Sequence, residues 1–427
     1  MVFTCHIKMY LKYIFNVPSS IMDTKQNPPH TRSNYKYLII GGGMTADSAV
    51  QAIRNADSTG TIGVISAESD PPYNRPPLSK SLWKGESLDT VWRETSQDKV
   101  TLHLSRTASA IDPADKRISD TEGNTYSWEK LLLATGGSPR RFLFGGDDII
   151  YFRTVQDYRR LRALTETGQR FAVIGGGFIG SEIAAGLRMN EKEVTILFPG
   201  KSIGHRIFPR DLSQFLSTFY QEKGVKVLAG ETVSGFGRQG KQFFLKTSNA
   251  REVLVDGVVA GLGIEPNVEL AQAARLQVDN GIVVDEFLRT SHSDIYAAGD
   301  VAAFHNPSLG KRIRVEHEDN ANTMGKLAGI NMTGQSQPYH HLPFFYSDMF
   351  ELGYEAVGEL DSRLETFSDW KQPNKEGVIY YLQNGRVRGV LLWNVWGQVE
   401  GARKLIADPG PFRPEDLKGR LKKKGTI

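Results

Sequence analysis

The stretch FAVIGGGFIGSE, residues 171–182, decides the fold. An apolar run leads into Gly175, Gly177 and Gly180, and apolar residues at helical spacing follow it. In a GxGxxG turn the first glycine permits a tight turn from strand to helix, and the second lets a pyrophosphate approach the backbone. The third lets helix and strand pack closely, so that the phosphates face the N–H groups at the helix N-terminus. The stretch therefore predicts a strand, a turn and a helix that bind one dinucleotide.

A similar stretch, YLIIGGGMTADSA, lies earlier in the chain, at residues 37–49. In chain order, its glycine turn is the first turn and that at residues 175–180 is the second turn. Its Gly41, Gly43 and Ala46 fit the pattern GxGxx(G/A). Glu68 ends the next apolar run, at the place where an acidic side chain accepts hydrogen bonds from a ribose. A solvated loop glutamate is the alternative for Glu68. The chain is therefore expected to bind two dinucleotides, one at each glycine turn.

The residues that follow the second turn leave the choice of nicotinamide cofactor open. The apolar run TILF at residues 195–198 ends in PGKS, so Gly200 stands where an acid would favour NAD. Lys201, His205 and Arg206 follow closely, and positive side chains there accommodate the 2′-phosphate of NADP. Both NADH and NADPH remain candidates.

Two dinucleotides held face to face imply an electron transfer between them. A nicotinamide passes hydride only to a partner that accepts two electrons, and a flavin is the obvious one. We therefore expect non-covalent FAD at one turn and NADH or NADPH at the other. Such a reaction depends on alignment and electrostatics and needs no general acid or nucleophile. No metal site is predicted.

The apolar runs predict an α/β fold. Continuous apolar runs between helical segments favour parallel strands that are covered on both faces. A helix is expected at 178–189, and another over 154–167 with Thr154 as its N-cap. After about residue 335 the pattern alternates as in antiparallel strands, with an Asn-Gly turn at 384–385. The runs expected to be parallel strands are 37–40, 62–66, 130–134, 171–174, 193–198 and 294–298.

Composition excludes several classes of function. The 427 residues suggest two or three domains, and a net charge of +4 from 52 basic and 48 acidic residues is weak evidence for a nucleic-acid or membrane partner. The chain has one cysteine, Cys5, which excludes a disulfide framework, a CxxC redox pair and a zinc site of several thiolates.

The first residues have two readings. Residues 1–21 carry no acidic residue and two lysines, as a weak targeting sequence would, but Met22 could equally be the true start. We therefore expect residues 1–34 to be a disordered leader or a start-site artefact. No apolar run is long enough to span a bilayer. The expected location is the cytoplasm, or the mitochondrion if residues 1–21 are a real presequence.

Longer motifs resemble those of FAD-dependent pyridine nucleotide-disulfide oxidoreductases, in the branch of the ferredoxin reductases and apoptosis-inducing factors. The resemblance covers about residues 36–410, and its C-terminal motifs are more specific than the glycine turns. The similar stretches are PPYNRPPLSK (71–80), LLLATGGSPR (131–140), VIGGGFIGSE (173–182), GLGIEPNVELA (261–271), YAAGDVA (296–302), RVEHEDNANTMGKLAGINMTG (314–334), YSDMFELGYEAVGELDS (346–362) and GVLLWNVWGQVEGARKLI (389–406).

This resemblance implies three domains. Two are Rossmann-like dinucleotide-binding domains, and the third is an α+β domain of the reductase dimerisation type. An FAD domain of residues 35–153 and 267–335 would be split by an inserted NAD(P)H domain of residues 154–266. Residues 336–427 would form the C-terminal domain.

The resemblance also implies roles for residues around the flavin. Lys80 and Glu182 would pair near the flavin N5 atom, and Phe178 would cover the flavin face until nicotinamide arrives. His317 would lie on the opposite side together with Glu316. The remaining residues implied to bind FAD or NAD(P)H are Arg75, Ala134, Thr135, Gly136, Ile179, Gly263, Gly299, Asp300 and Tyr346.

Three departures from the family pattern limit what the resemblance implies. Tyr346 stands where a related protein has tryptophan, Gly200 replaces the expected acid, and the chain between Glu365 and Gly377 is short. Because animal apoptotic proteins carry a long insertion there, no death function is inferred.

The expected function is a reductase. Hydride would pass from NAD(P)H to FAD, and electrons then to a ferredoxin, a rubredoxin, a quinone or oxygen. The alternative is a redox sensor or scaffold that turns over slowly and uses its reduced state to dimerise or recruit a partner. A homodimer is compatible with either function, and DNA binding through general basic charge is the least favoured function.

Overall fold

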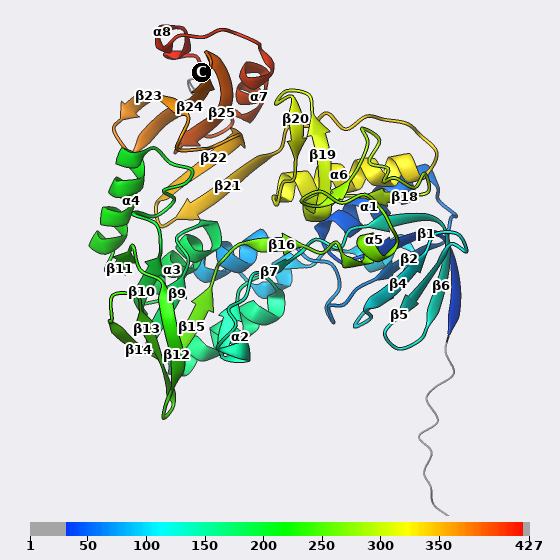
Figure 1. Ribbon diagram of the computed structural model, residues 1–427, viewed down its shortest axis with the longest axis horizontal. Coiled ribbons are helices and arrows are strands. Elements are labelled where there is room, and N and C mark those ends of the chain that lie inside the picture. The colour runs from blue at the N-terminus through cyan, green and yellow to red at the C-terminus, as the bar shows by residue number, and fades with distance from the viewer. Residues whose placement is uncertain (1–30, 422–427) are drawn as a thin grey trace, which may run out of the picture.

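Each glycine turn follows a parallel strand, and the two strands belong to two separate sheets. The computed structural model describes residues 31–421 (Figure 1). In the first sheet β1 lies between β2 and β6, β3 lies outside β2, and β18 pairs with the carboxyl half of β6; all these pairs are parallel. The antiparallel strands β5 and β4 continue from the amino half of β6. The strands are β1 Arg32–Ile40, β2 Ile62–Ile65, β3 Val100–His103, β4 Ala108–Asp112, β5 Arg117–Asp120, β6 Thr125–Leu133 and β18 Ile295–Ala297.

The second sheet is wholly parallel, in the order β11-β10-β9-β15-β8. The apolar run before Gly175 forms its central strand, β9, because every side chain from Phe171 to Ile174 is buried. The strands are β8 Ile149–Tyr151, β9 Arg170–Ile174, β10 Glu193–Phe198, β11 Lys226–Ala229 and β15 Gly257–Ala260.

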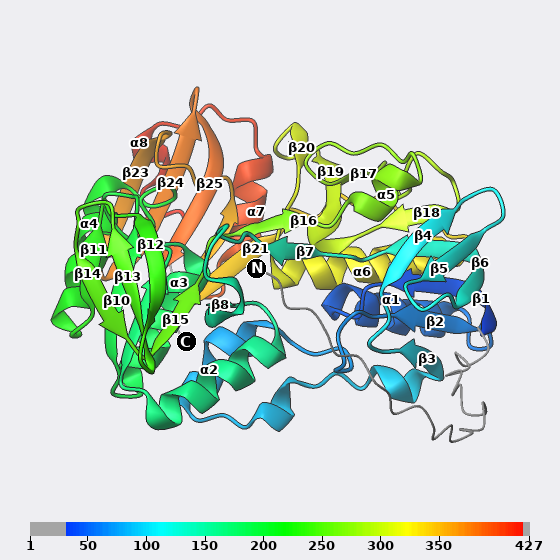
Figure 2. The same ribbon diagram turned by 60° about the horizontal axis from the view of Figure 1, so that its bottom comes forward.

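Two short antiparallel strands, β7 and β16, connect the two nucleotide-binding units (Figure 2). β7 (Gly137–Pro139) leaves the first unit, and β16 (Ile264–Pro266) returns to it. The chain therefore crosses twice at one place, which brings the two glycine turns to the same side of the molecule.

The C-terminal part is a five-stranded antiparallel sheet in the order β21-β22-β25-β24-β23. Asn384 and Gly385 both have positive φ, at 54° and 73°, as the predicted Asn-Gly hairpin turn requires. The strands are β21 Phe344–Met349, β22 Leu352–Gly358, β23 Glu365–Gln372, β24 Glu376–Gln383 and β25 Arg386–Trp393.

Helices cover the sheets as the sequence predicts. Thr154 caps α2 and forms a capping box with Asp157. The helices are α1 Met44–Ala56, α2 Val155–Thr167, α3 Phe178–Met189, α4 Arg210–Glu222, α5 Glu269–Ala273, α6 Glu318–Met332, α7 Val399–Ala407 and α8 Pro414–Leu417. The 3-10 helices are Pro76–Ser79, Ser81–Lys84, Leu88–Val91, Thr95–Asp98, Gly146–Asp148 and Gly299–Val301. The remaining strands are β12 Val233–Gln239, β13 Gln242–Thr247, β14 Glu252–Val255, β17 Ile282–Val283, β19 Ala302–Asn306 and β20 Lys311–Ile313.

The second nucleotide-binding unit and the C-terminal sheet share one apolar core. Phe208, which follows β10, meets the rings of Tyr354 and Trp393 edge-on at centroid distances of 5.4 and 5.5 Å. The first unit has its own core between its sheet and helices α1 and α6. The C-terminal sheet is therefore packed directly against the second nucleotide-binding unit.

The predicted α/β class, with two parallel nucleotide-binding sheets and a C-terminal α+β part, is confirmed. The structure differs from the predicted limits at two places. Residues 32–34, expected in the leader, begin β1, because their backbone pairs with residues 125–127 of β6. Residues 149–151, expected in the first domain, form β8 of the second sheet. The leader itself lies mostly outside the described residues, and the domain limits stay a prediction.

No helix among residues 31–421 combines the length and the apolar character that crossing a bilayer demands.

Candidate nucleotide and redox site

The first glycine of each turn has a conformation that only glycine adopts readily. Gly41 has φ +111° and Gly175 has φ +120°. A β-carbon at Gly41 would overlap the carbonyl oxygen of Ala134, and one at Gly175 would overlap that of Gly261. Each turn therefore packs closely against the residue that follows the neighbouring strand.

The second glycine of each turn faces open space. Gly43 and Gly177 are the N-caps of α1 and α3, and neither receives a side-chain cap. A β-carbon at either position would meet nothing within 4 Å. Both helix N-termini thus present uncapped N–H groups, which favour a phosphate group.

The third position of each turn packs helix against strand. A β-carbon at Gly180 would overlap the carbonyl oxygen of Gly175, so glycine is required there. Ala46, its counterpart in α1, is fully buried. The two turns therefore have the geometry that the GxGxx(G/A) spacing predicts. Each turn, together with the N-terminus of the helix after it, is called a cradle below, and both cradles face open space at their second glycine.

Two connected cavities lie between the turns. A cavity of about 830 Å³ is lined from both nucleotide-binding units, and a smaller one of about 250 Å³ lies along the first turn. Met44, Arg75, Pro139, Arg153 and Asp300 line both cavities. Residues from both nucleotide-binding units therefore line two adjoining cavities.

Most of the predicted site residues line these cavities. The larger cavity takes in Arg75, Lys80, Gly177, Phe178, Ile179, Glu182, Gly263, Asp300, Glu316, His317 and Tyr346. The smaller one takes in Gly41, Gly43, Glu68, Arg75, Ala134, Thr135, Gly136 and Asp300. Gly299 does not line either cavity; its φ is +78°, and a β-carbon there would overlap the Thr45 hydroxyl. Lys201 and Arg206 also lie outside both cavities.

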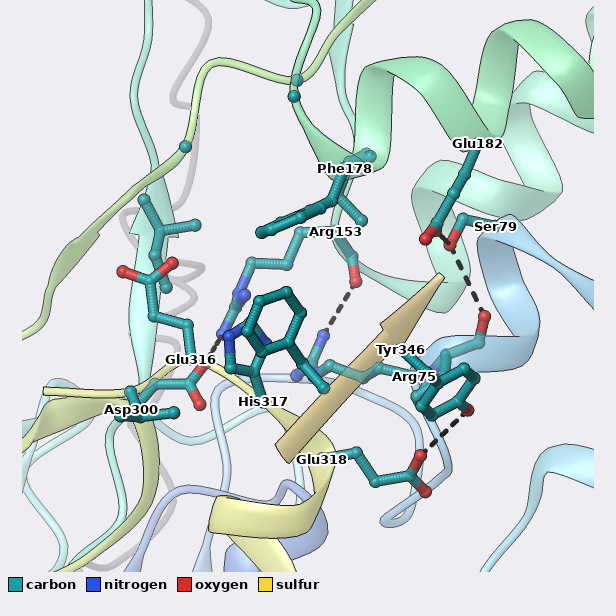
Figure 3. A pocket seen from close by; sticks show the side chains of 18 of the residues that line it. Arg75, Ser79, Arg153, Phe178, Glu182, Asp300, Glu316, His317, Glu318 and Tyr346 are labelled. Carbon is teal, nitrogen blue, oxygen red and sulfur yellow. Dashed lines mark hydrogen bonds and ion pairs between the residues drawn. The ribbon is translucent and has the colours of Figure 1, made fainter. Parts of the chain in front are cut away.

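Lys80 and Glu182 form a buried ion pair at the side of the larger cavity. Figure 3 shows Glu182 on this side, next to Ser79. Lys80 Nζ lies 2.9 Å from Glu182 Oε1, and the two side chains are 11% and 2% exposed. Ser79 Oγ donates to Glu182 Oε2 and Ser347 Oγ donates to Glu182 Oε1, both at 2.5 Å. Glu182 is thus held by three donors. The Lys80 ammonium also lies 5.1 Å from the centroid of the Tyr346 ring.

Aromatic rings cover the cavity beside this pair. Phe178, the first residue of α3, lies with its centroid 5.3 Å from that of Phe345 and 6.0 Å from that of His317. His317 stacks on Phe345 at 4.3 Å with an interplanar angle of 14°. Loss of hydration lowers the pKa of His317 to about 4. At pH 7 this imidazole is therefore neutral.

At the ribose side of the first turn, Glu68 is held by two donors. Arg75 Nη2 lies 2.5 Å from Glu68 Oε1, and the Tyr73 hydroxyl donates to Glu68 Oε2 at 2.6 Å. Arg75 also donates to the carbonyl of Arg153 at 3.0 Å. Arg153 in turn pairs with Asp300 at 2.9 Å. The charges along the first cradle are thus paired with one another and prearranged.

Two further carboxylates line the larger cavity. Glu316 Oε1 lies 2.7 Å from Arg314 Nη2, and desolvation raises the pKa of Glu316 despite this partner. Glu318 accepts a hydrogen bond of 3.1 Å from the Tyr346 hydroxyl. Desolvation also raises the pKa of Tyr346, so its hydroxyl keeps its proton.

Sequence reasoning missed several residues that build the site. Ser79 and Ser347 hold Glu182, Tyr73 and Arg153 hold the first cradle, and Phe345 stacks on His317. Ser79 and Ser347 each adjoin a residue that was singled out, but neither lies in a pattern of its own. Only the packing of distant segments reveals them.

The residues present fit a dinucleotide at each turn. The uncapped helix N-termini, the open space at Gly43 and Gly177, and the acid at Glu68 suit pyrophosphate and ribose. No group of three or more metal-ligating side chains was found in the described residues.

The depressed pKa of His317 predicts a pH dependence of stability. The imidazole has a pKa of about 4 in the folded protein and an ordinary pKa of 6.5, so it binds its proton more strongly in the unfolded chain. The contribution of His317 to stability should therefore be constant above pH 6.5 and fall as the pH drops toward 4. Urea unfolding at a series of pH values measures this. His317→Phe should lose that part of the slope; an unchanged slope would contradict the assignment.

Comparisons with known proteins agree with this geometry. The sequence model of the family described as pyridine nucleotide-disulphide oxidoreductase matches residues 35–325. A second model, described as apoptosis-inducing factor, mitochondrion-associated, C-term, matches residues 328–376 and 368–408.

Relatives and solved structures resemble the chain over most of its length. Apoptosis-inducing factor 1, mitochondrial, of Dictyostelium discoideum is 34% identical over 90% of this chain and 83% of its own. The anthranilate 1,2-dioxygenase system ferredoxin–NAD(+) reductase component of Burkholderia cepacia is 32% identical over 89% of this chain and 96% of its own. A crystal structure of the covalent putidaredoxin reductase–putidaredoxin complex has a TM-score of 0.84 and 28% identity, covering 90% of this chain and 95% of its own. The chain belongs to the pyridine nucleotide-disulphide oxidoreductase family, as an NAD(P)H-dependent flavoprotein oxidoreductase of the branch that includes ferredoxin reductases and apoptosis-inducing factors.

Proposed function

We propose that this protein is an FAD-dependent reductase that takes electrons from NAD(P)H and passes them to a ferredoxin-type protein. The observation that carries the proposal is the cavity of about 830 Å³ lined from both glycine-turn units, with the Lys80–Glu182 pair at its side. Two separate nucleotide sites would not need such a shared space. A hydride transfer between two rings does need it, because the reacting atoms must lie about 3–3.5 Å apart.

FAD supplies the redox chemistry when it is bound, since it accepts a hydride and can release electrons singly. The chain aligns the two nucleotides through its cradles and covers the cavity with Phe178. Lys80 holds a positive charge where burial leaves it poorly screened, which favours negative charge developing nearby. Glu182 and its two serine donors hold the ammonium group in place.

The acceptor is proposed from the relatives. The Burkholderia cepacia relative is a ferredoxin–NAD(+) reductase component, and the solved reductase was captured with putidaredoxin. A rubredoxin, a quinone or oxygen are the other acceptors to test. The single cysteine excludes an internal pair of redox cysteines.

The proposal is tested by anaerobic reduction. Purified protein should be yellow, and NADPH or NADH should bleach its absorbance at roughly 450 nm. Adding an oxidised ferredoxin should restore the colour much faster than adding air. Colourless protein, or a band that neither nucleotide bleaches, would contradict the proposal.

A second candidate function is a slow redox sensor or scaffold. The match of the C-terminal part to the apoptosis-inducing factor model favours it. In that case the reduced protein should persist in air, and its molecular mass in solution should change on reduction. Rapid turnover with a ferredoxin and an unchanged mass would reject the sensor. Location in the cytoplasm, or in the mitochondrion through residues 1–21, stays a prediction.

A further inference from the structure

The loop between β10 and α4 lies beside the second glycine turn. Gly204 N donates to the carbonyl of Gly176 at 2.9 Å, and Phe198, the last residue of β10, packs against Gly176. In dinucleotide-binding sheets the end of the strand next to the glycine strand meets the adenosine ribose. The loop therefore stands at the ribose end of the second cradle.

Gly200 leaves no space for the acid that selects NAD. A β-carbon at Gly200 would overlap Nδ1 and Cε1 of His205, so the imidazole ring fills the place of an acidic side chain. Two carboxylates on segments that contact this loop have arginine partners. Glu231, 3% exposed, pairs with Arg251, and Asp361 pairs with Arg363.

The loop presents an excess of positive charge. Residues 199–210 include Lys201, Arg206 and Arg210 but no acidic residue. Lys201 and Arg206 are exposed, and neither forms an ion pair within residues 31–421. An anion that binds here would meet donors without having to break an existing pair.

The backbone of the loop is held firmly although these side chains are free. Ser362 donates through its hydroxyl to the carbonyl of His205 at 2.8 Å and through its N–H to that of Arg206 at 2.9 Å. The Tyr381 hydroxyl donates to the carbonyl of Ile207 at 2.6 Å. These partners come from the C-terminal part of the chain. Less ordering entropy is lost when a ligand binds a loop that is already fixed.

We propose that Lys201, His205 and Arg206 form a subsite for the 2′-phosphate of NADPH, so that this protein uses NADPH in preference to NADH. The proposal rests on the proposed function, because it concerns the same nicotinamide dinucleotide, whose adenosine end would lie outside the larger cavity. The selective ligand feature is a phosphate monoester on the adenosine ribose. Arginine and lysine bind such a group by charge-assisted hydrogen bonds. Because Gly200 stands in place of an acid, no carboxylate at that position repels the 2′-phosphate.

Calorimetric binding of two probes to the flavin-loaded protein tests the subsite without turnover. Adenosine 2′,5′-bisphosphate should bind about tenfold or more tightly than adenosine 5′-monophosphate, a ratio that exposed charges can reach at low salt. Equal affinities for the two probes would overturn the inference alone. If neither probe binds, the proposed function fails as well.

Substitutions test whether Lys201 and Arg206 cause the difference in affinity between the two probes. Lys201→Ala with Arg206→Ala should bring the two affinities together, whereas Lys226→Ala should leave their ratio unchanged. Lys226 is an exposed lysine at the start of β11. It lies toward the amino ends of the parallel strands, whereas the loop follows the carboxyl end of β10. A ratio that survives the double substitution would overturn the proposal.

A gain of function gives an independent check on stable protein. Gly200→Glu with His205→Ala restores an acid and makes room for it, so kcat/KM should shift toward NADH by about tenfold or more relative to NADPH. An unchanged preference in a variant that retains its flavin would overturn the proposal.

Discussion

Replacing Lys80 by alanine is expected to destabilise the protein by about 3–5 kcal/mol, the usual cost of leaving a buried charge without its partner. Glu182 would remain 2% exposed, with only the hydroxyls of Ser79 and Ser347 as donors. Urea unfolding at pH 7 measures the loss. The double variant Lys80→Met, Glu182→Gln should recover much of it, because no isolated charge is then left in the core.

Lys84 provides a matched control only four positions along the chain. Its pair with Asp348 is 3.3 Å long and the side chains are 42% and 34% exposed, so Lys84→Ala should cost at most about 1 kcal/mol. A loss at Lys80 as small as that at Lys84 would contradict the buried-pair interpretation.

The flavin midpoint potential separates a structural role of Lys80 from a redox role. Lys80→Ala should also make the flavin harder to reduce, because a positive charge near it stabilises the negative charge gained on reduction. Ser347→Ala leaves Lys80 in place and should change the flavin midpoint potential less. An identical midpoint potential in the wild type, Lys80→Ala and Ser347→Ala would mean that Lys80 only stabilises the fold.

A valine at the second glycine of either turn should remove one nucleotide and spare the other. Gly43 and Gly177 have φ of −95° and −91°, so a side chain causes no backbone strain, and a β-carbon meets nothing within 4 Å. The side chain would instead occupy the space into which the pyrophosphate must come. Gly43→Val should be purified without flavin, whereas Gly177→Val should keep flavin and raise the KM for NAD(P)H at least about tenfold.

Flavin content by absorbance and steady-state kinetics measure this reciprocal pattern. Both variants should unfold close to the wild type, in contrast to Gly180→Val, whose side chain would overlap the Gly175 carbonyl. If Gly43→Val retained flavin at full occupancy, the first turn would not be the flavin cradle.

Features determined by neighbouring residues were predictable from the sequence. The glycine turns, the Thr154 cap and the Asn384–Gly385 hairpin each depend on a few adjacent residues whose backbone preferences are strong. The resemblance to a known family supplied the Lys80–Glu182 pair, which lies across 102 positions that no periodicity connects.

Features that depend on how distant segments pack were not predictable. Ser347 meets Glu182 from 165 positions away, and Phe345 meets His317 because β21 passes over the start of α6. β8 joins the second sheet because its three buried apolar residues pair with β15, which comes about a hundred residues later. Serine and phenylalanine have many ordinary uses, so nothing in their local sequence distinguishes these positions.

The interlocked rings of Phe208, Tyr354 and Trp393 make the C-terminal sheet part of the hydrophobic interior of the second nucleotide-binding unit. The two parts are thus separate in chain topology but share one apolar core. A fragment that stopped before β21 would expose apolar side chains of this core. It would also lose the hydrogen bonds that Ser362 and Tyr381 donate to the loop after β10. We therefore expect the C-terminal sheet and the second nucleotide-binding unit to fold and unfold together.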